Sequence, residues 1–530
     1  MILQLIIYFF IVQIIHSIST TRLYKLAGYH WWYAVIPVYN AIVLMKIIKR
    51  PRWWVLLLFL PVINLIMFPV IWVETIRSFG KVKTIDTCLV LGTLGCYITY
   101  LNYNSASLIY RSDRSLKPDT GTGEWVSSVL FAVIAATIVH TYVVQPFVIP
   151  TSSMEKSMLV GDFLFVSKVH YGARTPITAL ALPMVHDTIP ILKTKSYVFS
   201  DDPAEKQSTW LNMFQMPYFR LPGLQDIKRN DIVVFNQPAD TLRDMNNFHP
   251  DRSYLKPIDK KTNLVKRCVG LPGDTLSLHN GYVYINGAKT DNELENKLQF
   301  SYIVQTNGST LSKNYMYDRF GVTDDYGAIK PGFYYFKSLT RGTVERLRKN
   351  PNIVEIKRIV ADDKAAAEPV FPNHSAYTNT VDQWAPIYIP EKGQQIKIDP
   401  RTLPLYKRII TTYENNTLKV IGNAIYINGI KKDTYTFKQD YYWMMGDNRH
   451  NSIDSRFWGF VPFDHVVGKP VLTWLSWDKE GKKIRWERIF TTVNKKGEQQ
   501  SYAWIPGLLL SGYILFYLSQ KRSLKKSRKQ

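Results

Sequence analysis

The sequence predicts a mainly β domain with an inserted subdomain, joined to helical membrane segments at both ends of the chain. Apolar runs recur near both termini, at 1–15, 53–73, 88–101, 126–144 and 504–518. Between the last two runs, apolar-alternating segments flank Asn-Gly pairs, which is the pattern of β-hairpins. The net charge of +24 fits a membrane or nucleic-acid partner. Because the charge is concentrated at membrane flanks and no nucleic-acid-binding module is recognisable, we expect a membrane and no nucleic acid.

The N-terminal part, 1–104, is expected to be a membrane region with about three spans. The first run has no preceding basic segment and no small-residue cleavage site, which indicates a retained span and not a cleaved signal peptide. The stretch 31–54 is apolar but broken by prolines and followed by basic residues. We expect it to lie in the membrane interface or to re-enter the membrane.

The remaining boundaries follow from span length and the positive-inside rule. The polar loop 105–124 is expected in the cytoplasm, and 125–145 forms a transmembrane anchor. Residues 146–500 then lie outside. A last span at 503–520 returns, and the basic tail 521–530 stays in the cytoplasm. The basic loop with Arg77, Lys81 and Lys83 disagrees with this arrangement, because it would face outward.

The outer part reads as β-rich. The segment 230–238 is a short buried strand, and 276–289 carries turns at Asn280-Gly281 and Asn286-Gly287. A similar hairpin unit returns at 418–432. Between the two units, 290–415 is rich in Tyr, Lys, Asn and Pro and has no clear helical periodicity. We expect this stretch to be an inserted subdomain that shapes substrate access and takes no part in the chemistry.

A candidate nucleophile lies directly beyond the anchor, in the stretch TSSM at 151–154. Serine hydroxyls are weak nucleophiles and need a base within hydrogen-bond reach and donors for an oxyanion. Ser153 is the best candidate by position. The histidines that compete for the role of base are His170, His186, His249, His279 and His450. None lies in a stretch that indicates a prepared site, and the simpler interpretation is surface or packed histidines.

Lys266 is the alternative base, in the stretch LVKRCVGLPGDTL at 264–276. It lies in an apolar, β-branched strand pattern that is followed by a Gly-Leu-Pro-Gly turn. A lysine that points into apolar surroundings is costly to charge, so its pKa falls and it becomes a usable base. A solvated strand lysine is the plainer reading of this pattern.

A third stretch, 444–462, concentrates Asp, Asn, Ser and Arg side chains. It is either a loop stabilised by its own hydrogen bonds or a buried polar network that holds a site. Cys268 is the one cysteine of the part at 146–500, so that part has no internal disulfide. The sequence shows no phosphate-binding loop and no Cys/His metal spacing, so we expect no cofactor and no metal.

Taken together, the segments IPTSSM, RNDIVVF, KRCVGLPGD and GDNRHNSIDSRFWGFV, in this order after a membrane span, resemble bacterial type I signal peptidases (leader peptidases). Four boxes in order are far more specific than any one of them. They cover 150–172, 228–238, 264–289 and 418–468. They leave out the N-terminal membrane region and two insertions, at 177–226 and 290–415.

The resemblance implies a role for each matched residue. Ser153 would be the nucleophile and Lys266 the general base of a membrane-bound serine endopeptidase. The Thr151 hydroxyl would form the oxyanion hole with the Ser153 N–H, and Ser452 would orient the lysine amine. Arg267, Asp447, Asp454 and Arg456 would form structural ion pairs.

The resemblance also implies an all-β catalytic domain of signal-peptidase type, whose apolar surface touches the membrane. The implied substrates are signal peptides of exported preproteins, cut after small residues. The lipid bilayer and the secretion translocon are further expected partners. The implied location is the bacterial inner (cell) membrane, with several spans and the catalytic domain facing the periplasm or exterior.

Three positions depart from the family pattern. Lys156 replaces a proline and is a rival base, Thr151 replaces a serine, and His450 stands where an acidic residue is common. Two alternatives therefore stay open. The chain could be a Ser/Lys protease for other membrane substrates, including itself. It could also be an idle, membrane-anchored β-rich binding or assembly protein.

Overall fold

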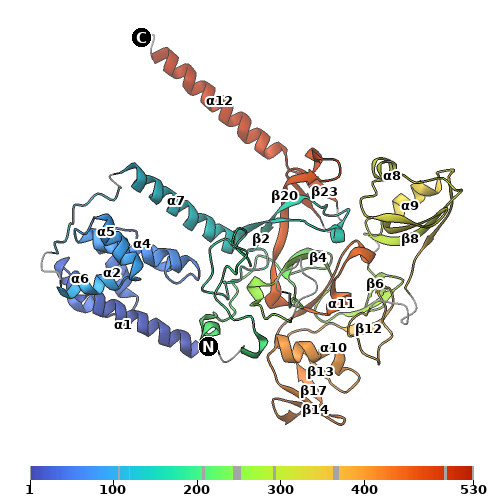
Figure 1. Ribbon diagram of the computed structural model, residues 1–530, viewed down its shortest axis with the longest axis horizontal. Helices are drawn as coiled ribbons and strands as arrows, with labels where there is room; N and C mark the ends of the chain where they lie inside the picture. The colour runs from blue at the N-terminus through green and yellow to red at the C-terminus, as the bar shows by residue number, and fades with distance from the viewer. Residues whose placement is uncertain are drawn as a thin grey trace. The chain divides into compact units, whose positions relative to one another are not determined.

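The computed structural model describes all residues except 1, 105–107, 118–119, 206–208, 243–251, 291–293, 362–368, 495–497 and 528–530. The chain forms two compact units (Figure 1). The first, here called the helical unit, comprises Met1–Val143, Arg174–Leu221 and Thr241–Lys261. The second, here called the β unit, comprises Val144–Ala173, Pro222–Asp240 and Thr262–Gln530. Most of the first expected insertion, 177–226, thus belongs to the helical unit.

The helical unit is a cluster of helices of unequal length. Its helices are α1 (Ile2–Leu26), α2 (Tyr39–Ile47), α3 (Trp54–Leu57), α4 (Ile63–Ser78), α5 (Thr84–Gly92), α6 (Cys96–Asn104) and α7 (Gly121–Ile138). A π-helical turn, Val139–Val143, extends α7. Helices α1 and α6 are joined by polar contacts: Asn102 Oδ1 accepts from the Arg22 N–H at 3.0 Å, and the Ser19 and Thr99 hydroxyls lie 2.6 Å apart.

Two helices in the described residues are long and apolar enough to cross a membrane, Leu5–Leu26 and Gly121–Val143. The pair α5 and α6 is bent by 118° and would make a third span if it crosses as one. The apolar run 53–73, expected to be a span, is divided between α3 and α4. The turn between these helices contains Pro61, which has no N–H to donate, and Val62 at a φ of 70°.

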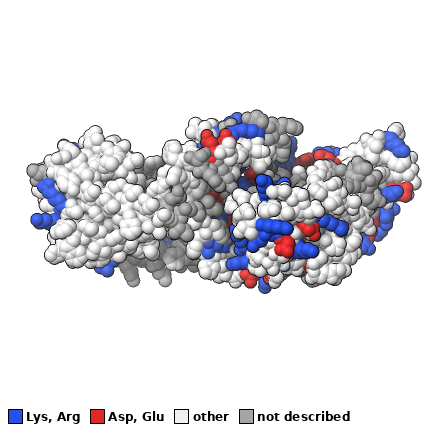
Figure 2. Space-filling model, turned by 90° about the horizontal axis from the view of Figure 1, so that it is seen from below, with Lys and Arg blue, Asp and Glu red and all other residues white. Residues whose placement is uncertain are grey.

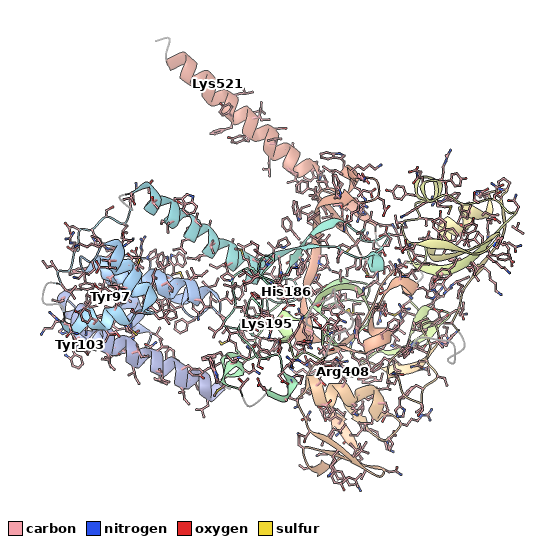
Figure 3. All side chains as sticks on the ribbon, viewed as in Figure 1. Tyr97, Tyr103, His186, Lys195, Arg408 and Lys521 are labelled. Carbon is pink, nitrogen blue, oxygen red and sulfur yellow. The ribbon has the colours of Figure 1, made fainter. Side chains whose placement is uncertain are left out.

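The last helix, α12 (Trp504–Ser527), is longer than expected but less apolar. Its apolar stretch is Trp504–Leu518. That is shorter than the roughly 20 residues that cross a bilayer without help from neighbours. Residues 521–527 of the expected cytoplasmic tail continue this helix, and Lys521 lies on it (Figure 3).

The surfaces of the two units differ in charge. In Figure 2 the helices at the left show mostly uncharged side chains with a small group of basic ones at the edge, whereas the β unit carries many charged side chains of both signs. Helix α1 exposes large apolar side chains, including Leu3 at 69%, Phe10 at 50% and Ile14 at 58%. Exposed apolar helix faces of this kind are typical of lipid contact.

The β unit is built around a ten-stranded antiparallel sheet in which β1-β2-β20-β3-β4-β18-β19 are neighbours in that order. Its strands are β1 (Val144–Val148), β2 (Asp162–Ser167), β3 (Ile232–Asn236), β4 (Asn263–Gly270), β18 (Tyr441–Met445), β19 (Val461–Pro462), β20 (Val466–Asp478), β21 (Lys483–Ile484), β22 (Thr491–Val493) and β23 (Gln499–Ser501). The expected mainly β fold is confirmed.

Both predicted hairpin units form. The first is part of a four-stranded sheet, β12-β5-β6-β7, with β5 (Thr275–His279), β6 (Tyr282–Ile285), β7 (Ala288–Lys289) and β12 (Trp384–Tyr388). The second is β14 (Leu418–Ile421), β15 (Ala424–Ile427) and β16 (Ile430–Lys431). Asn280 and Gly281 have φ angles of 50° and 75°, the left-handed conformation that a type I′ hairpin turn requires.

The stretch expected to be one insertion, 290–415, contributes to more than one sheet. Its first part forms an independent sheet, β11-β8-β10-β9, with β8 (Gln299–Thr306), β9 (Tyr326–Lys330), β10 (Phe333–Thr340) and β11 (Ile353–Arg358). Helices α8 (Lys313–Phe320) and α9 (Arg341–Arg348) pack on it, around a core that includes Val304, Met316 and Leu347 (Figure 1). We call 299–358 the inserted subdomain.

The second part of that stretch lies with the hairpins. Strand β12 pairs with β5, and Trp384 and Ile389 are buried in the largest apolar cluster of the β unit. The remaining strands and α-helices of the β unit are β13 (Gln395–Lys397), β17 (Thr434–Thr436), α10 (Leu403–Arg408) and, after the main sheet's β18, the short helix α11 (Ser455–Trp458).

Candidate active site

Ser153 lies in a 3₁₀ turn, Ser152–Met154, between β1 and β2. Met154 anchors this turn, because its side chain is only 1% exposed and is buried in an apolar cluster. Asn448 also holds the turn through two hydrogen bonds to its backbone. The Asn448 backbone N–H donates to the Ser153 carbonyl at 3.1 Å, and its Nδ2 donates to the Ser152 carbonyl at 3.1 Å. Ser153 itself is 8% exposed.

Lys266 lies on β4, which has a neighbouring strand on each side, and its backbone is paired with Val233 of β3. Its side chain is buried, and Nζ donates a hydrogen bond to Ser153 Oγ at 2.5 Å. Burial lowers the pKa of Lys266 to about 8, while the charge of Asp454 raises it and that of Arg456 lowers it. The structure thus joins the two residues that the sequence singles out, across 113 positions of the chain.

The polar stretch after β18 is buried, which decides between its two open interpretations. Asp447 accepts from Arg267 Nε at 2.7 Å and from Arg267 Nη2 at 2.6 Å, and Ser157 Oγ donates to it at 2.6 Å. Asp454 accepts from Arg456 Nε at 2.9 Å and from Arg456 Nη2 at 2.8 Å. The stretch is therefore an interior network and not a solvated loop.

The arginines hold the pKa of Asp447 and of Asp454 below the ordinary value, although burial by itself raises it. A buried ion pair contributes little net stability, but removing one partner leaves a charge without compensation. Both pairs flank strands that carry the site: Arg267 follows Lys266 on β4, and Asp454 accepts from the Gly446 N–H at 3.0 Å. Their geometry therefore sets where these strands meet the Ser153 turn.

Ser452 differs from its expected contact. Its hydroxyl is buried and has no hydrogen-bond partner in the described part of the chain, so the expected bond to Lys266 is not made. Ser452 can lie close to the nucleophile turn because Gly446, between them, has no side chain. A Cβ built on Gly446 would lie 2.5 Å from the Ser153 carbonyl and would overlap the Ser452 hydroxyl. The amine of Lys266 is directed to Ser153 instead.

Thr151 and Lys156 flank the nucleophile turn and differ in burial. Thr151 is exposed, and its side chain does not cap the turn. Lys156 has a φ of 70°, and its Nζ donates to the Gly321 carbonyl of the inserted subdomain at 2.7 Å. Burial lowers its pKa. Its amine is thus engaged away from Ser153, which favours Lys266 over this rival.

The histidines that compete as bases have other partners. His170 Nδ1 lies 2.6 Å from Ser167 Oγ, and His279 Nε2 lies 3.4 Å from Ser277 Oγ. His186 belongs to the helical unit, where Nε2 lies 2.9 Å from the Lys261 carbonyl (Figure 3). His249 is outside the described residues.

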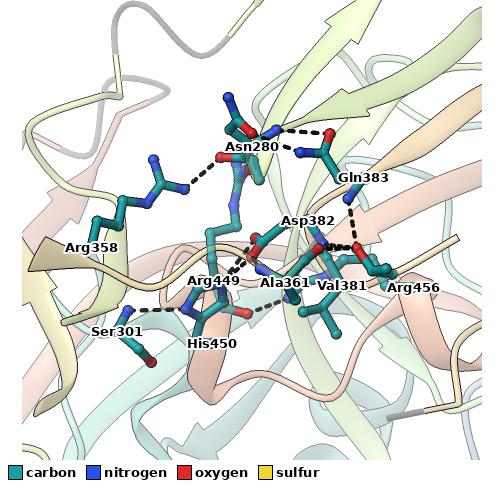
Figure 4. A network of polar contacts seen from close by, with 12 residues as sticks. Asn280, Ser301, Arg358, Ala361, Val381, Asp382, Gln383, Arg449, His450 and Arg456 are labelled. Carbon is teal, nitrogen blue, oxygen red and sulfur yellow. Dashed lines mark hydrogen bonds and ion pairs between the residues drawn. The ribbon is translucent and has the colours of Figure 1, made fainter. Parts of the chain in front are cut away.

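His450 is part of a separate network that joins the inserted subdomain, the turn at Asn280 and the segment before β12 to the polar stretch (Figure 4). Its Nδ1 accepts from the Ser301 N–H of β8 at 2.9 Å, and its Nε2 lies 2.9 Å from Asp382 Oδ1. Since Nδ1 accepts, Nε2 carries the proton and donates to the carboxylate. Nearby, Arg449 Nη1 donates to the Gly281 carbonyl at 2.5 Å. His450 stands where an acidic residue is common in the family, and here its imidazole joins the inserted subdomain to the polar stretch.

Asn448 is the residue whose role sequence reasoning missed. Besides its two bonds to the Ser152–Ser153 backbone, its Nδ2 donates to Asp324 at 2.5 Å and its Oδ1 accepts from Ser338 at 2.8 Å. Both partners belong to the inserted subdomain. The density of polar residues around Asn448 is the sequence feature that could indicate such a role. It does not identify the partners, which lie more than a hundred positions from Asn448 in the chain.

Among the described residues, no group of three or more His, Cys, Asp or Glu side chains could hold a metal ion. A buried serine hydroxyl that contacts a lysine amine of lowered pKa, on a β-rich domain, is an arrangement of serine endopeptidases that use lysine in place of histidine.

Comparison with known proteins gives the family within this class. The family model described as "Signal peptidase, peptidase S26" matches residues 122–343 and 387–477, more than half of the chain. The chain therefore belongs to the S26 signal peptidase family and is a serine endopeptidase of the type I signal peptidase kind. A second model, for a family of unknown function, matches residues 32–109 in the helical unit.

Several similar proteins carry the same description. Signal peptidase I of Buchnera aphidicola subsp. Acyrthosiphon pisum is 26% identical over 349 residues, which are 65% of this chain and 73% of that protein. Signal peptidase I of Helicobacter pylori strain J99 is 23% identical and aligns over 70% of this chain and 91% of its own length. Signal peptidase I of Haemophilus influenzae is 23% identical over 71% of this chain and 78% of that protein.

Proposed function

We propose that this chain removes signal peptides from exported preproteins, with Ser153 as the nucleophile and Lys266 as the general base. The observation that carries the proposal is the 2.5 Å contact between Lys266 Nζ and Ser153 Oγ inside the β unit. A neutral amine at that distance can accept the hydroxyl proton while the oxygen attacks a carbonyl carbon. The family and the similar proteins named signal peptidase I supply the substrate class.

The later steps use the same two groups. The attack gives a tetrahedral oxyanion, for which the Ser153 N–H and the Thr151 hydroxyl are the proposed donors. The ammonium of Lys266 then gives its proton to the leaving amine, and the mature protein departs. Water, deprotonated by the neutral lysine, hydrolyses the ester on Ser153 and frees the signal peptide. Ser452 is placed beside the turn, and we propose that its hydroxyl takes up a hydrogen bond to the lysine when substrate displaces the Lys266–Ser153 contact.

The direct test uses the purified full-length protein in detergent. An exported preprotein with Ala at positions −1 and −3 is the substrate, and N-terminal sequencing maps the product. We expect a single cut after the Ala at −1. Cleavage of the enzyme itself with no cut in the preprotein would support the protease of other substrates, and no cleavage of either would support the idle binding protein.

Membrane anchoring is proposed from the helices. Leu5–Leu26 and Gly121–Val143 have the length and composition of spans, and Ser153 follows the second of them closely. We propose that the β unit faces the periplasm or exterior and that the end of α12 lies in the cytoplasm. An anchored nucleophile at the bilayer surface meets a substrate whose apolar segment lies in the same membrane, so the encounter is already oriented.

Reporter fusions check this orientation. A reporter that is active only outside the cytoplasm, fused after Gln500, is expected to be active. The same reporter fused after Lys529 is expected to be inactive, since the basic end of the chain favours the cytoplasm. The reverse pattern would place Ser153 in the wrong compartment for exported substrates.

A further inference from the structure

A cavity of about 420 Å³ lies between the nucleophile segment and the inserted subdomain. Four cationic side chains line it, and one carboxylate, that of Asp318: the cations are Lys156, Lys297, Arg319 and Arg346. The remaining lining is polar or backbone except for Phe320, which is buried. The cavity is thus strongly positive.

Two of the cations in this cavity, Lys156 and Arg346, are held in place by neutral groups. Lys156 Nζ donates to the Gly321 carbonyl at 2.7 Å, and Arg346 Nη2 donates to the Phe320 carbonyl at 3.0 Å. The nearest ion-pair contact is weak, with Lys156 Nζ 4.0 Å from Glu155 Oε1. Carbonyls at the end of α8 orient the cations but do not cancel their charge.

The cations also act on one another. Burial has the largest effect on the pKa of Lys156 and lowers it. The carboxylates of Glu155 and Asp324 raise this pKa, whereas the positive charges of Arg346 and Lys297 lower it further. Like charges that share a cavity repel, and an anion placed between them relieves the repulsion. An anion would also accept hydrogen bonds from the guanidinium of Arg346, because the planar N–H donors of arginine fit the two oxygens of a carboxylate.

We propose that this cavity binds an acidic side chain of the preprotein, on the mature side of the scissile bond. This inference rests on the function proposed above. Lys156 is three residues from Ser153, which an extended chain spans in about 10 Å, so a substrate strand would reach the cavity with about the third to sixth residue after the cut. A polar, cationic cavity fits the polar mature segment and not the apolar signal segment.

The experiment compares two preproteins that differ only in mature positions three to six, with Asp and Glu in one and Asn and Gln in the other. For wild-type enzyme we expect kcat/KM to be about five- to tenfold higher for the acidic substrate, through a few partly exposed ion pairs, and to lose this preference as salt is added. In the variant Lys297→Gln/Arg346→Gln we expect the preference to vanish while cleavage of the neutral substrate is unchanged.

Matched controls make the result specific. The variant Lys330→Gln/Lys349→Gln removes two exposed cations of the same subdomain that do not line the cavity, and it should keep the preference. The variant Lys297→Arg should keep it as well, because the charge is retained. Thermal unfolding checks that the cavity variant is folded.

Three results would overturn the inference. They are equal cleavage of both substrates by wild type, a preference that persists in the cavity variant, and loss in that variant of only a response to vesicles of anionic phospholipid or to inorganic phosphate, which would assign the cavity to that ligand. Each leaves the proposed function intact, since the neutral substrate is still cut. Failure of wild type to cut either substrate would instead reject the proposed function.

Discussion

Replacing Ser153 by alanine is expected to lower preprotein cleavage by about 10⁴-fold or more, with the protein still folded and membrane-bound. The hydroxyl is the group that bonds to the substrate carbonyl in the proposed mechanism, and no other described side chain hydrogen-bonds to Lys266 Nζ. Loss of one oxygen in a turn held by backbone contacts leaves those contacts in place. Kinetics and thermal unfolding of the same preparation measure both parts of this expectation.

Lys266→Ala is expected to be equally inactive. Lys266→Arg is a sharper test, because arginine keeps the charge and much of the length but stays protonated at every accessible pH. We expect it to be inactive as well. A role of Lys266 that required only a positive charge would leave this variant active and would contradict the proposal.

Two neighbouring residues give the controls. Ser152 has the same side chain one position earlier, but its Oγ accepts from Asn451 Nδ2 at 2.8 Å, so Ser152→Ala should keep most activity. Lys156→Gln should cleave neutral substrates normally, because its amine is bound to the inserted subdomain. An inactive Lys156→Gln together with an active Lys266→Ala would reverse the assignment of the base.

The sequence predicted the parts of the fold that depend on local chemistry. The turns at Asn280-Gly281 and Asn286-Gly287 need a left-handed backbone, which Asn and Gly adopt at low cost, so the hairpin could be predicted from four residues. The boxes that resemble the family indicate Ser153 and Lys266 from the sequence alone. Their hydrogen bond, however, depends on the order of strands in the sheet, which no local pattern specifies.

Other features depend on long-range packing and could not be predicted. Strand β12 lies in a stretch of the sequence that has no clear periodicity. It nevertheless pairs with β5, which precedes the inserted subdomain in the chain, whereas β12 follows it. Hydropathy predicted apolar runs in the helical unit but not their bends, since a run such as 88–101 has the same composition whether it is straight or, as here, folded by 118°. The contacts of Asn448 with Asp324 and Ser338 join segments that have no shared pattern.

These contacts also change the interpretation of the inserted subdomain. The sequence predicts that the stretch 290–415, to which it belongs, shapes substrate access and takes no part in the chemistry. Asp324 and Ser338 of this subdomain, however, hold the side chain that fixes the Ser152–Ser153 backbone. Thr323 donates to Glu155 at 3.0 Å on the other side of the turn. The inserted subdomain therefore supports the nucleophile turn as well as forming one wall of the cationic cavity.

Cleavage is expected to rise with pH along a limb whose midpoint lies near 8, the lowered pKa of Lys266. A solvated lysine has a pKa of about 10.4, so at neutral pH almost none of it could accept a proton. Burial disfavours the ammonium form and moves the titration down. Below the midpoint the neutral fraction falls about tenfold per pH unit, so kcat/KM at two units below should be about 100-fold under its plateau.

The midpoint of this limb, and not its direction, distinguishes the lysine from the alternatives, because any general base must be deprotonated to act. The active form is the deprotonated one, so activity is lost as the pH falls, and the midpoint must follow the surroundings of Lys266 and not a carboxylate or an imidazole. Single variants His170→Gln, His279→Gln and His450→Gln should keep the midpoint, since their partners lie away from Ser153. A limb near the free-lysine value would show that the amine is solvated in the working enzyme. Disappearance of the limb in one histidine variant would make that imidazole the base, and the contact between Lys266 and Ser153 would then have a purely structural role.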